Sequence, residues 1–113
     1  MSKKATPKIT QHAKQRLLER IHTKGDAAQR LVNKAYKHGL SHRDVTGELR
    51  IYMSNAYLAH DIKFFNPKIY KNAIYIFDAN KLVTVYILPE ELQDVSKYVS
   101  EEKYEQLIIK WNL

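Results

Sequence analysis

The spacing of the apolar residues changes near the middle of this chain, and that change limits the folds it can adopt. Up to about residue 58, apolar residues recur every three or four positions, as in helices with one buried face. Between residues 69 and 88 they form short runs rich in isoleucine, valine and tyrosine, as in strands. Helices kept apart from an antiparallel sheet define the α+β class. We therefore predict N-terminal helices packed on a small antiparallel β-sheet, with a C-terminal helix.

Capping residues indicate where the helices begin and end. Thr10 is a good N-cap for a helix over residues 10–21, and a second helix is predicted over residues 27–38. Gly39 stands directly after it, where a residue in the left-handed conformation commonly ends a helix. A third helix is predicted over residues 48–58, although its aromatic and β-branched residues would also suit a strand.

The second half predicts three strands and one more helix. Strands are expected at residues 69–70, 73–77 and 82–88. Residues 62–65 would start or flank a further strand, which Asn66-Pro67 is expected to break. Ser100 is the expected N-cap of the final helix, with two glutamates in its first turn. The residues expected on its apolar side, or anchoring it to the core, are Tyr98, Tyr104, Leu107, Ile108 and Trp111.

Positive charge is concentrated in the first half of the chain. Residues 1–50 hold twelve Lys or Arg and four Asp or Glu, a balance of +8. Residues 51–113 hold seven and eight, a balance of −1. This asymmetry predicts RNA or another polyanion as a partner. The alternative is a basic domain whose charge serves solubility alone.

The remaining composition narrows the class of protein. The chain has no cysteine, which excludes disulfides, thiolate catalysis and cysteine-zinc sites. The spacing of His38, His42 and His60 does not match a zinc motif, so no metal is predicted. Residues 1–8 are expected to form a flexible basic arm, and residues 9–113 a single α+β domain. No apolar run is long enough to span a bilayer, so we expect a cytoplasmic protein with no membrane partner.

Four motifs follow one another along the chain, and they are His12-Ala13-x-x-Arg16-x-x-x-Arg20, Lys34-Ala35-Tyr36-x-x-Gly39, Ile69-Tyr70-x-x-x-Ile74-Tyr75-Ile76-Phe77 and Leu82-Val83-Thr84-Val85-Tyr86-x-Leu88-Pro89. In this order they resemble a group of small uncharacterised proteins from Gram-positive bacteria and their phages or mobile elements. That group resembles the RelE/barnase/colicin-type fold of metal-independent ribonucleases. The resemblance covers about residues 8–92. It implies a RelE-like fold and an endoribonuclease toxin that needs no cofactor and has a cognate antitoxin as partner.

Histidine and arginine in the first motif suit the cleavage of RNA. A ribonuclease without a metal needs a base, an acid and a cation close to the phosphate. His12, Arg16 and Arg20 are four residues apart and would share one side of an ideal helix. If that side faces the sheet, the predicted catalytic set is His12, Arg16 and Tyr86. The residues predicted to bind the nucleic acid are Arg20, Arg30, Lys34, Lys37, Lys63, Lys68, Tyr70 and Thr84.

Other interpretations of the same residues stay open. His12 would pack locally if the arginines pair with Glu19 or Asp26, and the strand tyrosines can serve sheet packing instead of base stacking. The scaffold would also suit a non-catalytic, anti-CRISPR-type inhibitor from a phage or mobile element, whose basic face blocks a host nuclease complex. A DNA-binding regulator is a third interpretation, but residues 21–26 lack the short turn of a helix-turn-helix.

Overall fold

The structure is a computed structural model that describes residues 6–111, apart from the side chains of residue 102 and residues 104–111. Its elements follow in the order β1 (Lys8–Ile9), α1 (Gln11–Arg16), the π-helical turn η1 (Leu17–Ile21), α2 (Gly25–His38), the 3-10 turn η2 (His42–Asp44), α3 (Gly47–Ala59), β2 (Phe65–Tyr70), β3 (Ala73–Asp78), β4 (Lys81–Ile87) and α4 (Glu90–Trp111). The predicted α+β class is confirmed, as is the helix that follows the sheet.

The strands form one sheet in the order β1-β4-β3-β2. β3 pairs antiparallel with β2 and with β4. β1 instead runs parallel to β4, with Lys8 opposite Lys81, so the sheet is mixed and not purely antiparallel. The sequence placed Lys8 in the flexible arm because two residues are too few to show an alternating pattern.

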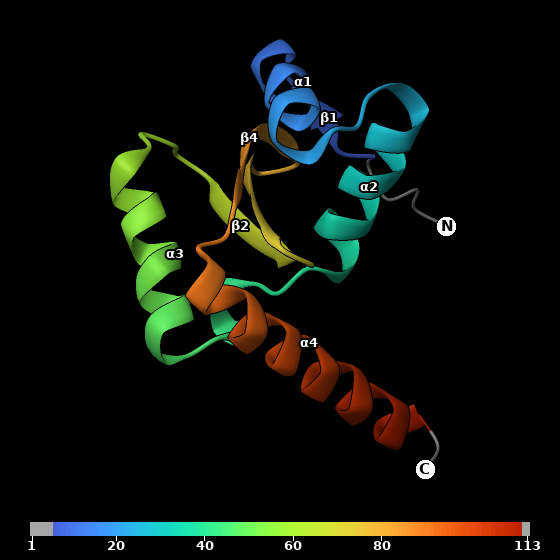
Figure 1. The fold of residues 1–113 in the computed structure, drawn as a ribbon, viewed down its shortest axis with the longest axis vertical. Helices are drawn as coiled ribbons and strands as arrows, with labels where there is room; N and C mark the ends of the chain where they lie inside the picture. The colour runs from blue at the N-terminus through green and yellow to red at the C-terminus, as the bar shows by residue number, and fades with distance from the viewer. Residues whose placement is uncertain (1–5, 112–113) are drawn as a thin grey trace.

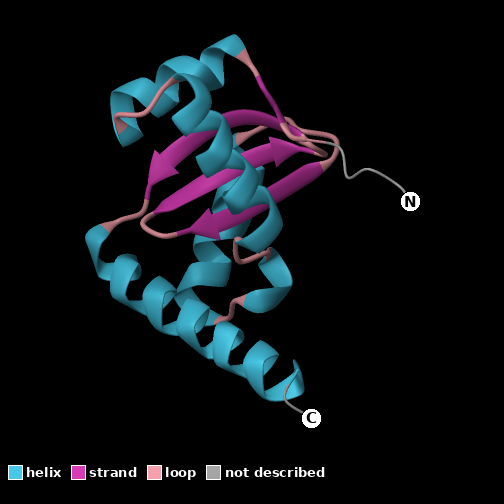
Figure 2. Ribbon diagram, turned by 90° about the vertical axis from the view of Figure 1, so that its right-hand side faces the viewer, coloured by secondary structure: helices cyan, strands magenta, loops and turns pink. Residues whose placement is uncertain are grey.

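Helices cover both faces of the sheet, which lies between α2 and α3 (Figure 1). β3 is central, and its residues from Ala73 to Phe77 are all buried. On one face Tyr75 and Phe77 pack with α1, η1 and α2. On the other face Ile74 and Ile76 pack with α3 and the start of α4. Figure 2 shows the strands side by side, with α4 extending below them.

The first helix begins and ends where the sequence predicts, but its last turn is wider. The side chain of Thr10 accepts a hydrogen bond from the N–H of Ala13 at 3.1 Å, which confirms the cap. From Leu17 to Ile21 the backbone forms η1, and His22 follows in the left-handed conformation. The spacing of the apolar residues gives no sign of this π-helical turn.

Pro67 lies inside β2, which corrects the predicted break at Asn66-Pro67. β2 is the last strand of the sheet, so only one of its edges pairs with a neighbouring strand. Proline cannot donate a main-chain hydrogen bond, and an edge strand tolerates it for that reason. The outer edge of β2 is partly covered by Leu40, whose N–H donates to the carbonyl of Ile69 at 2.7 Å.

The final helix begins at Glu90, directly after β4, and not at Ser100 as predicted. Glu90 and Glu91 bring negative charge to its first turn, where the helix dipole favours it. Ser100 lies inside the helix, where its hydroxyl donates to the carbonyl of Ser96 at 2.9 Å. The pair of glutamates after Ser100 imitates a helix start, which explains the wrong prediction.

Residues near its beginning hold α4 on the sheet. Leu92 and Ser96 are buried there, whereas Tyr98 is 68% exposed, so the prediction that Tyr98 anchors this helix is wrong. The remaining predicted contacts lie outside the described side chains, and they are those of Tyr104, Leu107, Ile108 and Trp111.

Gly39 is required for close packing and not for a left-handed turn. Its φ is −65°, so the predicted left-handed end of the second helix is wrong. A Cβ atom at this position would lie 2.5 Å from the carbonyl oxygen of Ala35 and 2.9 Å from the Cβ of Lys68. The end of α2 therefore passes against β2 with no room for a side chain.

We expect Gly39→Ala to lower the free energy of unfolding by about 2 kcal/mol, because the added methyl group must push α2 and β2 apart. Gly47→Ala is the matched control. Gly47 has a φ of +61° with open space around it, so the backbone alone costs about 1 kcal/mol. Urea unfolding of both variants measures the difference. Equal losses would contradict the packing role of Gly39.

Candidate functional site

Arg20 crosses from η1 to β4. Because a π-helix holds more residues per turn than an α-helix, Arg20 leaves the row that an ideal helix would form with His12 and Arg16. Nη1 of Arg20 donates a hydrogen bond to the main-chain carbonyl of Val85 at 2.8 Å. β1 covers only the first two residues of β4, and Arg20 binds the strand further along.

Tyr86 lies between Arg20 and His60. The Cζ atom of Arg20 is 4.7 Å from the centre of the Tyr86 ring, a distance at which a cation and an aromatic ring attract each other. The hydroxyl of Tyr86 is 3.2 Å from Nε2 of His60, within hydrogen-bonding distance. The three side chains come from η1, β4 and the residue that ends α3, and we call them the Arg20–Tyr86–His60 cluster.

The cluster is half-buried and carries the cation of Arg20. Among the side chains that the structure describes, no carboxylate lies within ion-pair distance of Arg20; the nearby Glu19 binds Arg16 at 2.7 Å, and Arg16 and Arg20 both help to lower its pKa. Tyr52 of α3 lies close by, where burial raises the pKa of its phenol and Tyr86 raises it further. Besides the guanidinium of Arg20, the site therefore contains the hydroxyls of Tyr52 and Tyr86, and no described carboxylate forms an ion pair with Arg20. This combination suits the binding of an anion.

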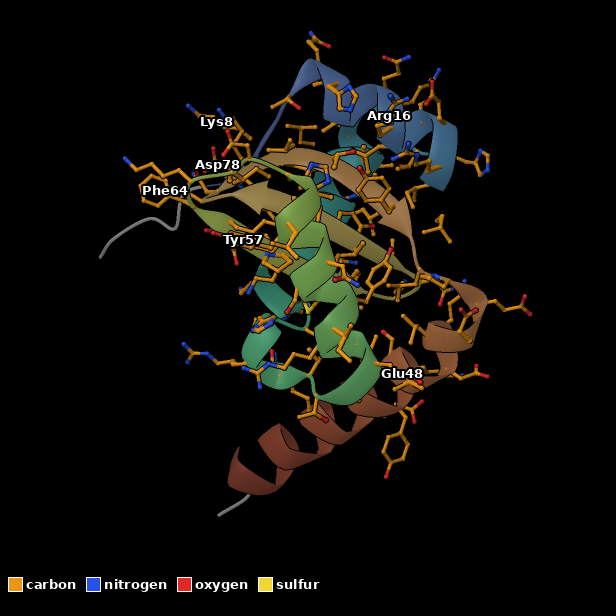
Figure 3. All side chains as sticks on the ribbon, turned by 90° about the vertical axis from the view of Figure 1, so that its left-hand side faces the viewer. Lys8, Arg16, Glu48, Tyr57, Phe64 and Asp78 are labelled. Atoms are coloured by element: carbon orange, nitrogen blue, oxygen red, sulfur yellow. The ribbon has the colours of Figure 1, made fainter. Side chains whose placement is uncertain are left out.

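The structure gives Tyr86 other partners than the predicted His12 and Arg16. Arg16 is occupied by Glu19, as one of the alternative interpretations expected, and Figure 3 shows it on α1 at the end of the molecule opposite α4. His12 is exposed and lines a hollow of about 930 Å³ between α1 and the first turn of α2. The histidine that meets Tyr86 is His60.

His60 was considered in the sequence only as a metal ligand. It ends α3, and nothing in the local pattern tells which strand the end of that helix meets. Only the packing of α3 across the sheet brings its imidazole to β4. Among the side chains that the structure describes, no three of His, Asp or Glu come close enough to hold a metal ion.

Some of the predicted nucleic-acid-binding residues are accessible and one is not. Arg30 and Lys34 are exposed on α2, and Lys63 is exposed with its Nζ 5.3 Å from the ring centre of Phe64. Thr84 is only 2% exposed, and its hydroxyl is buried. In this structure the side chain of Thr84 is therefore not accessible to a nucleic acid.

The other predicted binding residues gather near the edge of β2. Lys37 and Tyr70 line the same groove, and Lys68 lies beside it on the strand. Burial lowers the pKa of Lys68, and the nearby cation of Lys103 lowers it further. Lys103 in turn donates a hydrogen bond to a carboxylate oxygen of Asp44 at 3.0 Å.

Comparisons of the chain with protein-family models, with curated proteins and with solved structures found no match. The resemblance to RelE/barnase/colicin-type ribonucleases therefore stays a prediction. In the described part of the chain, no helix combines the length and the apolar character needed to cross a membrane.

We expect Arg20→Gln to lower the free energy of unfolding by about 1–2 kcal/mol, because a charged donor to the Val85 carbonyl is lost at a half-buried site. Arg16→Gln is the control. Its pair with Glu19 lies on the surface, where such pairs contribute little, so no measurable change is expected. Thermal or urea unfolding compares the two. A larger loss for Arg16→Gln would contradict this assignment.

Proposed function

We propose that this protein binds RNA and cleaves it without a metal at the Arg20–Tyr86–His60 cluster. The observation that carries the proposal is the 3.2 Å contact between the Tyr86 hydroxyl and Nε2 of His60, with the guanidinium of Arg20 over the same ring. A proton acceptor, a proton carrier and a phosphate-binding cation then meet at one place. The excess of positive charge in residues 1–50 supports a polyanionic substrate.

In the proposed reaction, the 2′-hydroxyl of one nucleotide attacks the adjacent phosphorus, and the bond to the 5′-oxygen of the next nucleotide breaks. The oxygen of Tyr86 takes the proton of the 2′-hydroxyl while its own proton moves to Nε2 of His60. The 5′-oxygen leaves with a proton from a water molecule, which takes the proton back from His60, so that Tyr86 and His60 return to their starting states. The products are a 2′,3′-cyclic phosphate and a 5′-hydroxyl. DNA lacks the attacking hydroxyl and is bound without being cleaved.

Arg20 stabilises the charge that develops on the phosphate oxygens. Only its Nη1 is engaged by the Val85 carbonyl, so the other N–H groups of the guanidinium remain to donate to phosphate. That hydrogen bond and the Tyr86 ring together hold the guanidinium in place before substrate binds. A cation fixed in this way loses little freedom when the charge develops, which is what electrostatic catalysis requires.

We expect Tyr86→Phe and His60→Gln each to slow RNA cleavage by roughly a hundredfold or more, because either change interrupts the path of the proton. Phenylalanine keeps the ring beneath Arg20, so the fold stays intact. Single-turnover cleavage of a labelled RNA with EDTA present measures the rates, and the 2′,3′-cyclic phosphate ends identify the chemistry.

His42→Gln is the matched control for His60→Gln. Nε2 of His42 is also 3.2 Å from a hydroxyl oxygen, that of Ser54, but this pair lines a pocket with residues of β2. The control variant is expected to cleave RNA at the rate of the unmodified protein. Full activity of Tyr86→Phe, or an equal loss in His42→Gln, would refute the proposed site.

A further inference from the structure

A basic groove of about 720 Å³ lies along the edge of β2, away from the Arg20–Tyr86–His60 cluster. It is bounded by the end of α2, by the turn between β2 and β3, and by α4, which passes below the end of α2 in Figure 1. Its volume is in the range of sites that hold small molecules. The residues of its wall that matter here are Lys37, Tyr70, Lys71, Lys97, Glu101 and Lys103.

Positive charge outweighs negative charge among the side chains of this groove that the structure describes. Four lysines line it, against one described carboxylate, that of Glu101. Lys103 also meets Asp44 at 3.0 Å, but its charge still lowers the pKa of Lys68 on the neighbouring strand. Like charges held this close repel each other, so an anion that enters the groove relieves the repulsion.

The accessible apolar surface of the groove is the half-buried ring of Tyr70. Leu40 and Ile69 lie beneath it, but each is only 1% exposed and belongs to the core. A ligand that carries phosphate alone would leave the ring of Tyr70 unused. A flat aromatic base can stack on Tyr70 while its phosphate meets the lysines.

Lys71 is held at the mouth of the groove in a strained conformation. Its φ is +55°, in the left-handed region that L-residues other than asparagine and aspartate rarely adopt. Its ammonium group lies 5.8 Å from the centre of the Tyr70 ring. Glycine would form this turn without strain, so the lysine is present at the expense of local stability. Strained residues of this kind cluster at active sites and ligand clamps.

We propose that this groove binds a nucleoside phosphate, with the base against the ring of Tyr70 and the phosphate held by Lys71 and Lys97. The same chemistry is offered by a free nucleotide and by an unstacked nucleotide within an RNA strand. The proposal goes beyond RNA cleavage, because it rests on residues of β2, α4 and the turn between β2 and β3, none of which belongs to the cluster.

The test compares Lys71→Gly with Ala79→Gly. Ala79 occupies the turn between β3 and β4 with a φ of +56°, so both substitutions relieve the same strain and both should raise the urea midpoint. Only Lys71→Gly removes a cation from the groove. The probes are adenosine 5′-monophosphate, a 2′-O-methyl decaribonucleotide that cannot be cleaved, and polyglutamate, each titrated by calorimetry and by NMR shifts.

We expect Lys71→Gly to weaken binding of the decanucleotide roughly tenfold and to reduce the slope of log affinity against log salt by about one, while Ala79→Gly binds as the unmodified protein does. Tyr70→Leu should weaken it roughly five- to hundredfold by removing the stacking ring. If adenosine monophosphate binds as tightly as the decanucleotide, and its affinity falls in the same variants, the groove is assigned to free nucleotides. Binding of the decanucleotide alone assigns it to RNA strands.

Three results would overturn the proposal. The first is an unchanged affinity of Lys71→Gly for the decanucleotide. The second is a loss of affinity in Ala79→Gly equal to that in Lys71→Gly. The third is an affinity for polyglutamate that matches the affinity for the decanucleotide and falls in the same variants. Because the probe RNA has no free 2′-hydroxyl, none of these outcomes depends on cleavage. A protein that binds the probes as expected but cleaves no RNA would refute the cluster and leave the groove standing.

Discussion

Burial of β3 on both faces is the constraint on which the rest of the structure depends. A strand whose neighbouring residues Ile74, Tyr75 and Ile76 are all buried needs a helical layer on each side of the sheet. The chain supplies α1, η1 and α2 to one face, and α3 and α4 to the other. The accessible parts of the sheet are then its edges, β4 beyond β1 and β2 beside α4. Both candidate sites lie at these edges.

Local sequence patterns correctly predicted the helices and strands that depend on residues close together in the sequence. The Thr10 cap, the helical spacing of α2 and the run of strand residues from Ala73 to Ile87 were sufficient for the helices and for the hairpin of β3 and β4. The wrong predictions concern residues whose structure depends on a segment that is distant in the sequence. The two-residue β1 exists only because β4 is beside it, and Pro67 is tolerated only because β2 is an edge strand. Gly39 is required because the end of α2 passes directly against Lys68 of β2.

The candidate site shows the same limit. From the sequence, Arg20 was predicted to bind nucleic acid, and Tyr86 to act in catalysis with His12 and Arg16. The predicted row of His12, Arg16 and Arg20 assumed an ideal α-helix through η1. His60 is separated from Tyr86 by a helix end, a loop and two strands, and no spacing rule joins the two residues. His12 was the more conspicuous histidine, since it belongs to a motif, yet the structure places it in a hollow beside α2.

Arg20 contributes to the fold, and in the proposed reaction to the chemistry, through the same guanidinium. Its hydrogen bond to Val85 ties η1 to β4, and its contact with the ring sets the position of Tyr86. Loss of activity in an Arg20 variant would therefore not separate a structural from a chemical role. The hydroxyl of Tyr86 does separate them, because its removal leaves the ring and the guanidinium packed as before. The proton path between Tyr86 and His60 is accordingly the part of the cluster on which the assignment of activity stands.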